Sequence, residues 1–433
     1  MDGETQLTMR LSIDALDLEG RGVARDEGKV CFVVGALPGE LVDAERLRQS
    51  KKHATARTVE VLKQSWQRVA PRCAYFGQCG GCALQHFDTA GQVAAKQRVL
   101  EDNLWHIGRV RAELIDRPIH GSPWAYRHRA RMSAHYVPSR GRVLIGFRER
   151  ASRYVADMRS CEVLPPAVYD LIEPLQWLLT ETSLRAQIPQ VELSCGENLT
   201  AVVLRNLAPP TQNDVALLTE FAAQHAIAIW LQPGEPDSAR PLRESALPSY
   251  RLPEFGLEFE FFPTEFTQVN FAVNRVLVRR AIALLQPMPG EHVADLFCGL
   301  GNFSLPMARR GAAVVGVEGS ARLVRRAESN AERNGLEEQC RFTVADLFTD
   351  GSIAAERFDK LLLDPPREGA VEIVKALSAP LPRRILYVSC NPATLARDAA
   401  VLVHVHGYRL RSVAVVNMFP HTGHAESIAL FEI

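Results

Sequence analysis

The residue with the clearest potential for covalent chemistry is Cys390, in the segment Ser389-Cys-Asn-Pro392. It directly follows an apolar run at 384–389 that is typical of a buried strand, so its thiol is predicted to lie at the carboxyl end of that strand. A thiolate is a strong nucleophile, and a nearby helix N-terminus or cation would lower the thiol pKa. An isolated cysteine is more often an inert buried thiol, so the interpretation depends on its neighbours.

Two carboxylates are predicted to reach the same edge of the sheet. Asp364 closes the preceding apolar strand, and Glu426 lies in the turn before the last strand, in the segment His421-Thr-Gly-His424-Ala-Glu426. A carboxylate placed there can accept a proton or bind a ligand by hydrogen bonds. The two histidines fit a direct role and a purely structural role in the turn equally well. The thiol and the carboxylates together indicate nucleophilic catalysis assisted by a general base.

A glycine-rich segment, Asp295-Leu-Phe-Cys-Gly-Leu-Gly-Asn302, follows the predicted strand at 292–297. Glycines let the backbone turn sharply and approach a ligand closely at the end of a strand. Glu318 ends the next strand, where it can accept hydrogen bonds from ribose hydroxyls, and Asp346 follows the third strand, near an adenine amino group. A P-loop and the third glycine of the dinucleotide fingerprint are both missing. The pattern resembles class I S-adenosylmethionine methyltransferases.

Four cysteines form a candidate metal site, with three close together in Cys73-x5-Cys79-Gly-Gly-Cys82 and the fourth at Cys161. Four thiolates can hold a [4Fe–4S] cluster or a zinc ion. Zinc ribbons usually use two close pairs, so three near cysteines and one distant cysteine favour iron–sulfur, with zinc left open. We interpret the remaining thiols as structural, namely Cys31, Cys195, Cys298 and Cys340.

The composition is that of a globular protein: the chain has 433 residues, of which 47% are hydrophobic, and 50 basic residues balance 50 acidic ones. No apolar run approaches the ~18 residues that a membrane span requires, and no secretory signal is visible, so we expect a cytoplasmic protein. Basic residues concentrate at 46–72 and 121–160. These stretches indicate a surface for a polyanion, although two ordinary solvated faces would also explain them.

The surrounding elements predict three domains. Short strands separated by glycine turns predict a small β-barrel at 1–68. Mixed strands and helices, with the cysteine cluster, predict an α+β middle domain at 69–263. Strands that alternate with helices predict an α/β, Rossmann-like parallel sheet at 264–433. Helices are predicted at 92–107, 167–180, 214–225, 273–285, 321–334 and 393–401.

The catalytic motifs together resemble the RNA 5-methyluridine methyltransferase family over the whole C-terminal half. The matching segments are Phe297-Cys-Gly-Leu-Gly-Asn302, Asp364-Pro-Pro-Arg367, Ser389–Pro392 and His421–Glu426. The resemblance implies that Cys390 adds to carbon 6 of uracil, that carbon 5 takes the methyl group of S-adenosyl-L-methionine, and that Glu426 removes the carbon-5 proton. It also implies cofactor contacts at Gln268, Phe297, Asn302, Glu318, Asp346 and Asp364.

The resemblance extends to the N-terminal half. Family members that act on 23S ribosomal RNA carry a four-cysteine cluster, whereas tRNA-specific members lack it, and members with an N-terminal TRAM barrel resemble this chain from end to end. This implies a TRAM barrel at 1–68 and a [4Fe–4S] cluster on Cys73, Cys79, Cys82 and Cys161. The implied substrate is a uridine flipped out of 23S rRNA, bound by a monomeric enzyme.

RNA contacts are predicted in the arginine-rich segment because it mixes cations with stacking faces. Two alternatives remain: a methyltransferase for tRNA or another rRNA site, and a non-catalytic iron–sulfur RNA-binding protein. The predicted RNA-contacting residues are Arg127, Arg129, Arg131, Arg140 and Arg142, with Tyr126, His128 and Tyr136.

Overall fold

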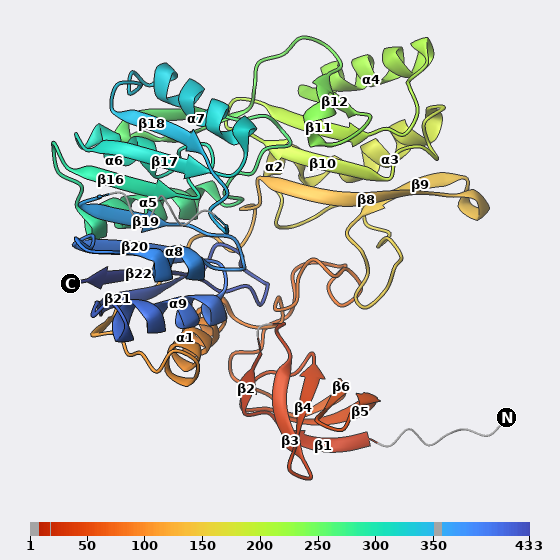
Figure 1. Ribbon diagram of the computed structural model, residues 1–433. Coiled ribbons are helices and arrows are strands. Elements are labelled where there is room, and N and C mark those ends of the chain that lie inside the picture. Colours follow the sequence, from red (N-terminus) through yellow and green to blue (C-terminus); the bar gives the residue numbers. More distant parts are fainter. Residues whose placement is uncertain (1–7, 18, 350–356) are drawn as a thin grey trace.

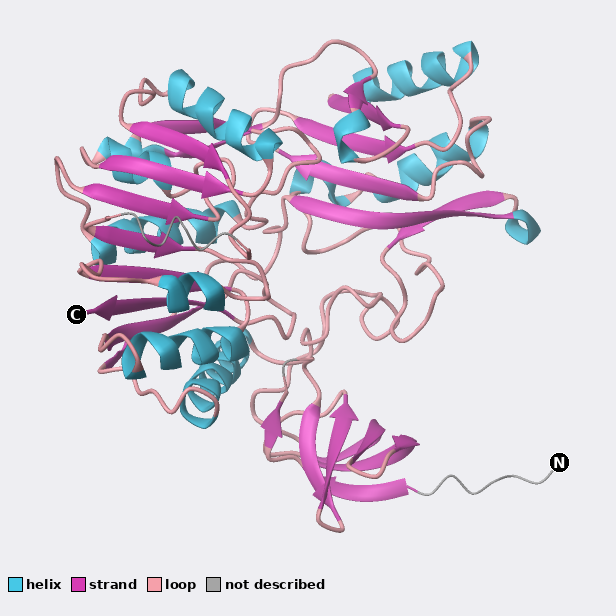
Figure 2. Cartoon of the chain, viewed as in Figure 1, coloured by secondary structure: helices cyan, strands magenta, loops and turns pink. Residues whose placement is uncertain are grey.

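The computed structural model describes residues 8–17, 19–349 and 357–433. Its described part contains two six-stranded sheets, one eight-stranded sheet and a two-stranded ribbon (Figures 1 and 2). The N-terminal sheet forms a separate small unit below the two larger sheets in Figure 1. None of the described helices combines the length and the apolar composition needed to cross a membrane.

The N-terminal sheet has the strand order β1-β5-β6-β4-β3-β2. The sheet curls on itself, because the backbone N–H of Asp14, just after β1, donates to the carbonyl of Val23 in β3 at 2.8 Å. Inward-facing Met9 and Leu11 alternate with exposed residues along β1, as expected for strands with one buried face. The predicted small barrel is confirmed. Its strands are β1 (Thr8–Ser12), β2 (Ala15–Leu16), β3 (Gly22–Asp26), β4 (Lys29–Val34), β5 (Leu41–Gln49) and β6 (His53–Lys63).

The middle sheet has the order β13-β12-β11-β10-β8-β9. The sequence interpretation missed β10, whose residues from Val191 to Cys195 are all buried, the polar Glu192 and Ser194 included. The single helix predicted at 167–180 is two helices, separated at Asp170 and Leu171. The strands are β8 (Arg129–Val137), β9 (Arg142–Gly146), β10 (Gln190–Cys195), β11 (Thr200–Arg205), β12 (Ile227–Gln232) and β13 (Arg240–Pro241), and the helices are α2 (Pro166–Tyr169), α3 (Ile172–Glu181) and α4 (Gln212–Gln224).

The C-terminal sheet has the order β18-β17-β16-β19-β20-β22-β21-β7, and β22 is antiparallel to its neighbours β20 and β21. Parallel strands connected by helices confirm the predicted Rossmann-like fold. The strands are β16 (His292–Leu296), β17 (Ala313–Glu318), β18 (Cys340–Val344), β19 (Lys360–Leu363), β20 (Arg384–Ser389), β21 (Arg409–Val416) and β22 (Glu426–Glu432). The helices are α5 (Phe271–Leu285), α6 (Ser304–Arg309), α7 (Ala321–Arg333), α8 (Val371–Ala376) and α9 (Pro392–His404).

An N-terminal segment also packs on the C-terminal sheet. Strand β7 (Leu114–Ile115) pairs in parallel with β21, and helix α1 (Thr89–His106) packs against α9 (Figure 1). The buried face of α1 includes two polar residues, Gln92 and Lys96, beside Leu100 and Leu104. The remaining elements are the ribbon β14 (Ser249–Leu252) and β15 (Leu257–Glu260), and the 3-10 turns η1 (Pro138–Arg140), η2 (Pro236–Ser238) and η3 (Pro253–Phe255).

Candidate active site and cysteine cavity

The thiol of Cys390 lies between the end of β20 and the start of α9. Asn391 caps this helix, since its Oδ1 accepts a hydrogen bond from the N–H of Ala393 at 3.1 Å. Cys390 is partly exposed, unlike the buried β20 that precedes it. The thiol therefore stands at the carboxyl edge of the parallel sheet, where such folds bind their ligands.

Strand pairing brings the two predicted carboxylates to this thiol. Ser389 in β20 pairs with Ser427 in β22, so Cys390 and Glu426 lie at matching ends of neighbouring strands. Asp364 follows β19, the strand on the other side of β20. Three residues that are far apart in the sequence thus meet at one edge of the sheet.

The proximity of the three groups affects their protonation. Burial, together with the charges of Glu426 and Asp364, raises the pKa of Cys390 to about 11, against the opposing effect of Arg367. Burial and the charge of Asp364 raise the pKa of Glu426 to about 8. A helix N-terminus and a cation do adjoin the thiol, but they do not give it the lowered pKa that would activate it, because burial and the carboxylates prevail.

The glycine-rich loop after β16 contains three positive φ angles, the first at the non-glycine residue Phe297, with φ +66°. Gly301 has φ +93°, and a Cβ atom there would lie 2.6 Å from Cδ1 of Leu305. Gly299 has φ +56°, and a Cβ atom there would meet no heavy atom within 4 Å. Buried Asp295 accepts from the hydroxyl of Ser304 at the start of α6. The loop is therefore packed tightly at Gly301 and open at Gly299, where a ligand has room.

Acidic residues follow the next two strands. Glu318, at the end of β17, accepts from the N–H of Gly299 at 3.2 Å and from the N–H of Ser320 at 3.0 Å. Asp346, after β18, accepts from the N–H of Phe348 and the hydroxyl of Thr349, at 3.0 and 2.8 Å. Glu318 thus adjoins the open part of the loop, whereas the carboxylate of Asp346 is held within its own turn.

Asn302, which closes the loop, is held by residues that the sequence interpretation missed. Its Oδ1 accepts from Asn274 and from the hydroxyl of Tyr250, both at 2.9 Å, and its Nδ2 donates to Asn274 at 3.0 Å. Gln268 lies two residues before Asn270, the N-cap of α5, the helix that carries Asn274. The sequence signal that could have identified Asn274 is an asparagine on the apolar face of the helix predicted at 273–285.

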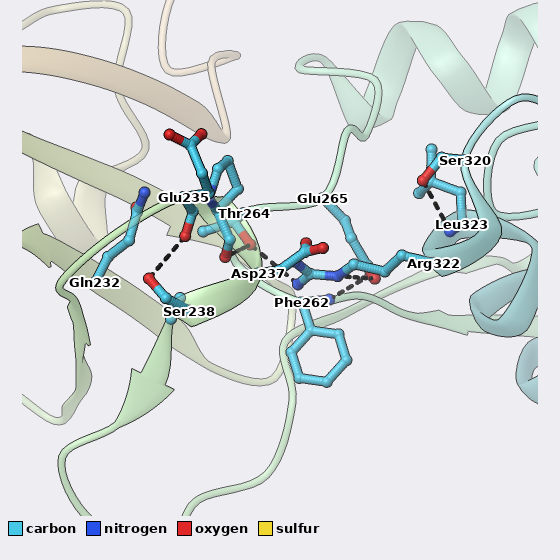
Figure 3. A network of polar contacts seen from close by, with 12 residues as sticks. Gln232, Glu235, Asp237, Ser238, Phe262, Thr264, Glu265, Ser320, Arg322 and Leu323 are labelled. Carbon is cyan, nitrogen blue, oxygen red and sulfur yellow. Dashed lines mark hydrogen bonds and ion pairs between the residues drawn. The ribbon is translucent and has the colours of Figure 1, made fainter.

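A buried ion-pair network fastens the segment before Gln268 to α7 (Figure 3). Glu265 accepts from the N–H of Phe262 at 2.7 Å and pairs with Arg322 and Arg326, at 3.0 and 3.3 Å. Arg322 also pairs with Asp237 of the middle domain. This network joins the middle domain to the helix that follows the Glu318 turn.

The four predicted metal ligands line one cavity of about 120 Å³. Burial raises the pKa of Cys82 to about 11 and that of Cys161 to about 12. The N–H of Gly81 donates to the sulfur of Cys79 at 3.4 Å. Among the described residues, no three or more His, Cys, Asp or Glu side chains converge closely enough to hold a single metal ion. The four thiols thus line the same cavity without converging on one point, and their all-sulfur donor set suits a thiolate-ligated group.

Two of the predicted RNA-contacting residues are engaged inside the protein, so that prediction is wrong for them. Tyr126 is 4% exposed and donates its hydroxyl hydrogen to the carbonyl of Pro420 at 3.0 Å. Arg129 pairs with buried Glu192 at 2.6 Å and donates to backbone carbonyls at 264 and 265. Both side chains serve domain packing, because each has its polar atoms satisfied by protein partners.

Two known protein families match this chain, one in its N-terminal part and one in its C-terminal part. Residues 5–58 match the TRAM domain, and residues 251–432 match the tRNA (Uracil-5-)-methyltransferase family. The chain is 56% identical to the 23S rRNA (uracil(1939)-C(5))-methyltransferase RlmD of Aromatoleum aromaticum, over 97% of this chain and 98% of that protein. The corresponding protein of Dechloromonas aromatica is also 56% identical, over 97% and 99% of the two chains.

A solved structure is similar over the full length. It is the Pyrococcus abyssi tRNA (uracil-54, C5)-methyltransferase in complex with S-adenosyl-L-homocysteine, with a TM-score of 0.77 and 25% identity over 98% of this chain and 99% of that one. The RlmD relatives match this chain over nearly its whole length, so the similarity is not limited to one shared domain. The chain therefore belongs to the RlmD family of 23S rRNA (uracil-C5)-methyltransferases.

Proposed function

We propose that this protein, acting as a monomer, methylates carbon 5 of one uridine in 23S rRNA, at the position that its relatives' names give as uracil 1939. The observation that carries the catalytic assignment is the placement of Cys390 and Glu426 at matching ends of the paired strands β20 and β22. A tRNA substrate is the second candidate, because the similar solved structure acts on tRNA. The higher identity to the rRNA enzymes favours 23S rRNA.

The placement of Cys390 and Glu426 at one edge of the sheet allows the following reaction. The thiol of Cys390 gives up its proton to solvent, and the thiolate forms a bond to carbon 6 of uracil while the electron pair of the ring double bond moves to make carbon 5 nucleophilic. S-adenosyl-L-methionine supplies the electrophilic methyl group that carbon 5 takes. Glu426 then accepts the carbon-5 proton, the double bond re-forms, and Cys390 leaves as the thiolate.

We assign S-adenosyl-L-methionine to the open side of the glycine-rich loop. The free space at Gly299 and the adjoining carboxylate of Glu318 support this assignment. Asn302 shapes the loop through its pair with Asn274, which uses one of its two Nδ2 hydrogens and leaves the other for the ligand. The proposed contacts are Gln268, Phe297, Asn302, Glu318, Asp346 and Asp364.

We further propose that Cys73, Cys79, Cys82 and Cys161 hold a [4Fe–4S] cluster. Their shared cavity and all-sulfur donor set support it. Cysteines bind iron as thiolates, and the positive charge of iron would offset the burial that now raises the pKa of Cys82 and Cys161.

Metal analysis of anaerobically purified protein tests the cluster. We expect brown protein with about four iron and four sulfide per chain, loss of both in Cys161→Ser, and retention in Cys195→Ser, which alters a buried thiol outside the cavity. Colourless protein with one zinc per chain would refute the iron assignment.

Trapping with 5-fluorouridine tests the nucleophile. Fluorine at carbon 5 cannot leave as a proton does, so RNA carrying it should form a denaturation-resistant adduct with the wild-type protein and S-adenosyl-L-methionine. Cys390→Ala should form none, while Cys340→Ala, which removes a buried thiol at the start of β18, should trap normally. An adduct with Cys390→Ala would show that the nucleophile is another residue, and preferential trapping of tRNA would favour the second substrate.

A further inference from the structure

Lys96 is a buried amine that the proposed chemistry does not use; burial lowers its pKa to about 7, against the opposing effect of the charge of Glu426, which favours its protonated form. It lies on the packed face of α1, is 3% exposed, and donates from Nζ to Asn417 Oδ1 at 2.8 Å and to the carbonyl of Phe419 at 2.9 Å. Burying an ammonium group is costly unless its surroundings compensate. Both acceptors lie in the segment 417–421, the first part of the connection between β21 and β22, and Glu426 begins β22 at the end of that connection.

Gln92, one turn earlier on α1, holds the same segment. Its Oε1 accepts from the N–H of His421 at 2.8 Å, and its Nε2 lies 3.2 Å from Nδ1 of that histidine. His421 has φ +63°, a left-handed conformation that a non-glycine residue adopts only when its surroundings impose it. Gln92 is fully buried and its Nε2 also donates to the carbonyls of Leu84 and Phe87, at 3.0 and 2.8 Å, so its side chain is fixed and can impose this conformation.

The same segment is also held by residues that adjoin the cysteine cavity. The carbonyl of His421 accepts from the N–H groups of Ala83 and Leu84, at 2.8 and 2.9 Å. Tyr126, which lines the cavity, donates to the carbonyl of Pro420. The segment is therefore held by both α1 and the cysteine-rich part of the chain.

We propose that Lys96 and Gln92 are positioning residues for the general base: they clamp segment 417–421 so that Glu426 meets carbon 5, and the charge of Lys96 favours the ionised carboxylate. This inference rests on the proposed role of Glu426. Glu426 is 7% exposed, and its Oε2 has no hydrogen-bond partner among the described residues, as expected of an oxygen that is kept free to accept a proton.

The surrounding charges give the direction of the electrostatic effect. Glu426 faces Lys96 from α1, Asp364 after β19 and Cys390 after β20, and Lys96 also acts on His421 and His424. Burial and Asp364 raise the pKa of Glu426, whereas Lys96 lowers it. Removing the charge of Lys96 should therefore raise the pKa of Glu426 and leave less ionised base at neutral pH.

Two rapid-quench assays distinguish a loss of positioning at Glu426 from a general loss of folding or activity. Adduct formation on 5-fluorouridine RNA requires Cys390 and methyl transfer but not the base, whereas breakdown of the adduct on ordinary uridine RNA requires Glu426. Lys96→Met should slow breakdown about ten-fold or more and move its pH dependence to higher pH. Trapping should stay within about two-fold of wild type, because the proposed clamp acts only on the base.

Matched variants make the result decisive. Glu426→Gln is the reference for a lost base, and Arg98→Met is the control, because Arg98 lies on the exposed side of the same helix. Lys96→Gln removes the charge with less change of polarity, and Gln92→Ala tests the other half of the clamp, so the inference stays testable if Lys96→Met folds poorly.

Each outcome has one meaning. Accumulation of adduct on uridine RNA by Glu426→Gln and by the Lys96 and Gln92 variants supports the clamp. If Glu426→Gln accumulates adduct while those variants behave like Arg98→Met, the clamp is refuted and the proposed function stands. If Glu426→Gln does not accumulate adduct, the assigned base is wrong. Parallel loss of trapping and breakdown in the Lys96 and Gln92 variants would show a structural role only and overturn the inference.

Discussion

Substitution of the two loop glycines by alanine should separate ligand binding from folding. At Gly299 the new Cβ enters open space, so the cost to folding is only the left-handed backbone, about 1–2 kcal/mol. At Gly301 the φ of +93° is combined with a Cβ position 2.6 Å from the side chain of buried Leu305. Overpacking adds about 1–3 kcal/mol to the backbone strain there, so Gly301→Ala should lose about 2–5 kcal/mol.

Gly299→Ala, which costs less in folding than Gly301→Ala, should nevertheless weaken ligand binding. If S-adenosyl-L-methionine occupies the open space, a methyl group there should weaken binding by about 1–3 kcal/mol, which is about 5- to 150-fold in Kd. Calorimetric titration with S-adenosyl-L-homocysteine and thermal unfolding measure the two effects separately. Wild-type affinity in a folded Gly299→Ala protein would refute the placement of the ligand against this loop.

Three further predictions concern the network, the RNA and the base. Glu265→Ala should destabilise the protein by about 3–5 kcal/mol in urea unfolding, because it leaves buried Arg326 without its carboxylate; a change below about 1 kcal/mol would contradict this. RNA affinity should fall steeply between 50 and 200 mM salt, as phosphate contacts release counterions, and an unchanged Kd would exclude a basic RNA surface. Adduct breakdown on uridine RNA should accelerate as pH rises through about 8, because Glu426 accepts a proton only when ionised and burial raises its pKa; a flat rate from about pH 6 to 9 would argue against this base.

The C-terminal sheet was predictable because its pattern is local. Apolar strands alternate with helices, and β20 has the predicted bounds of 384–389. Parallel strands bring their carboxyl ends to one edge, so the neighbourhood of Cys390 and Asp364 followed from strand order alone. The adjacency of Glu426 also needed β22 to run antiparallel beside β20, a strand direction that periodicity alone does not give.

Other features depend on contacts between distant segments and escaped prediction. Helix α1 follows the cysteines in sequence but packs against α9, and the sequence interpretation did not single out Lys96. A lysine four residues before Leu100, on the apolar stripe of the predicted helix, was the available signal. Arg129 likewise lies in a basic stretch, and only the fold shows that Glu192 neutralises it. The pKa of Cys390 depends on burial and two carboxylates, which spacing does not reveal.

Mapping of 5-methyluridine in 23S rRNA from cells with and without the gene tests the central claim most directly. We predict that deletion removes one 5-methyluridine, at the position corresponding to uracil 1939, and that the wild-type gene restores it while Cys390→Ala does not. The Cys340→Ala gene should restore it as a matched control. An unchanged 5-methyluridine pattern in the deletion strain, or restoration by Cys390→Ala, would contradict the assignment.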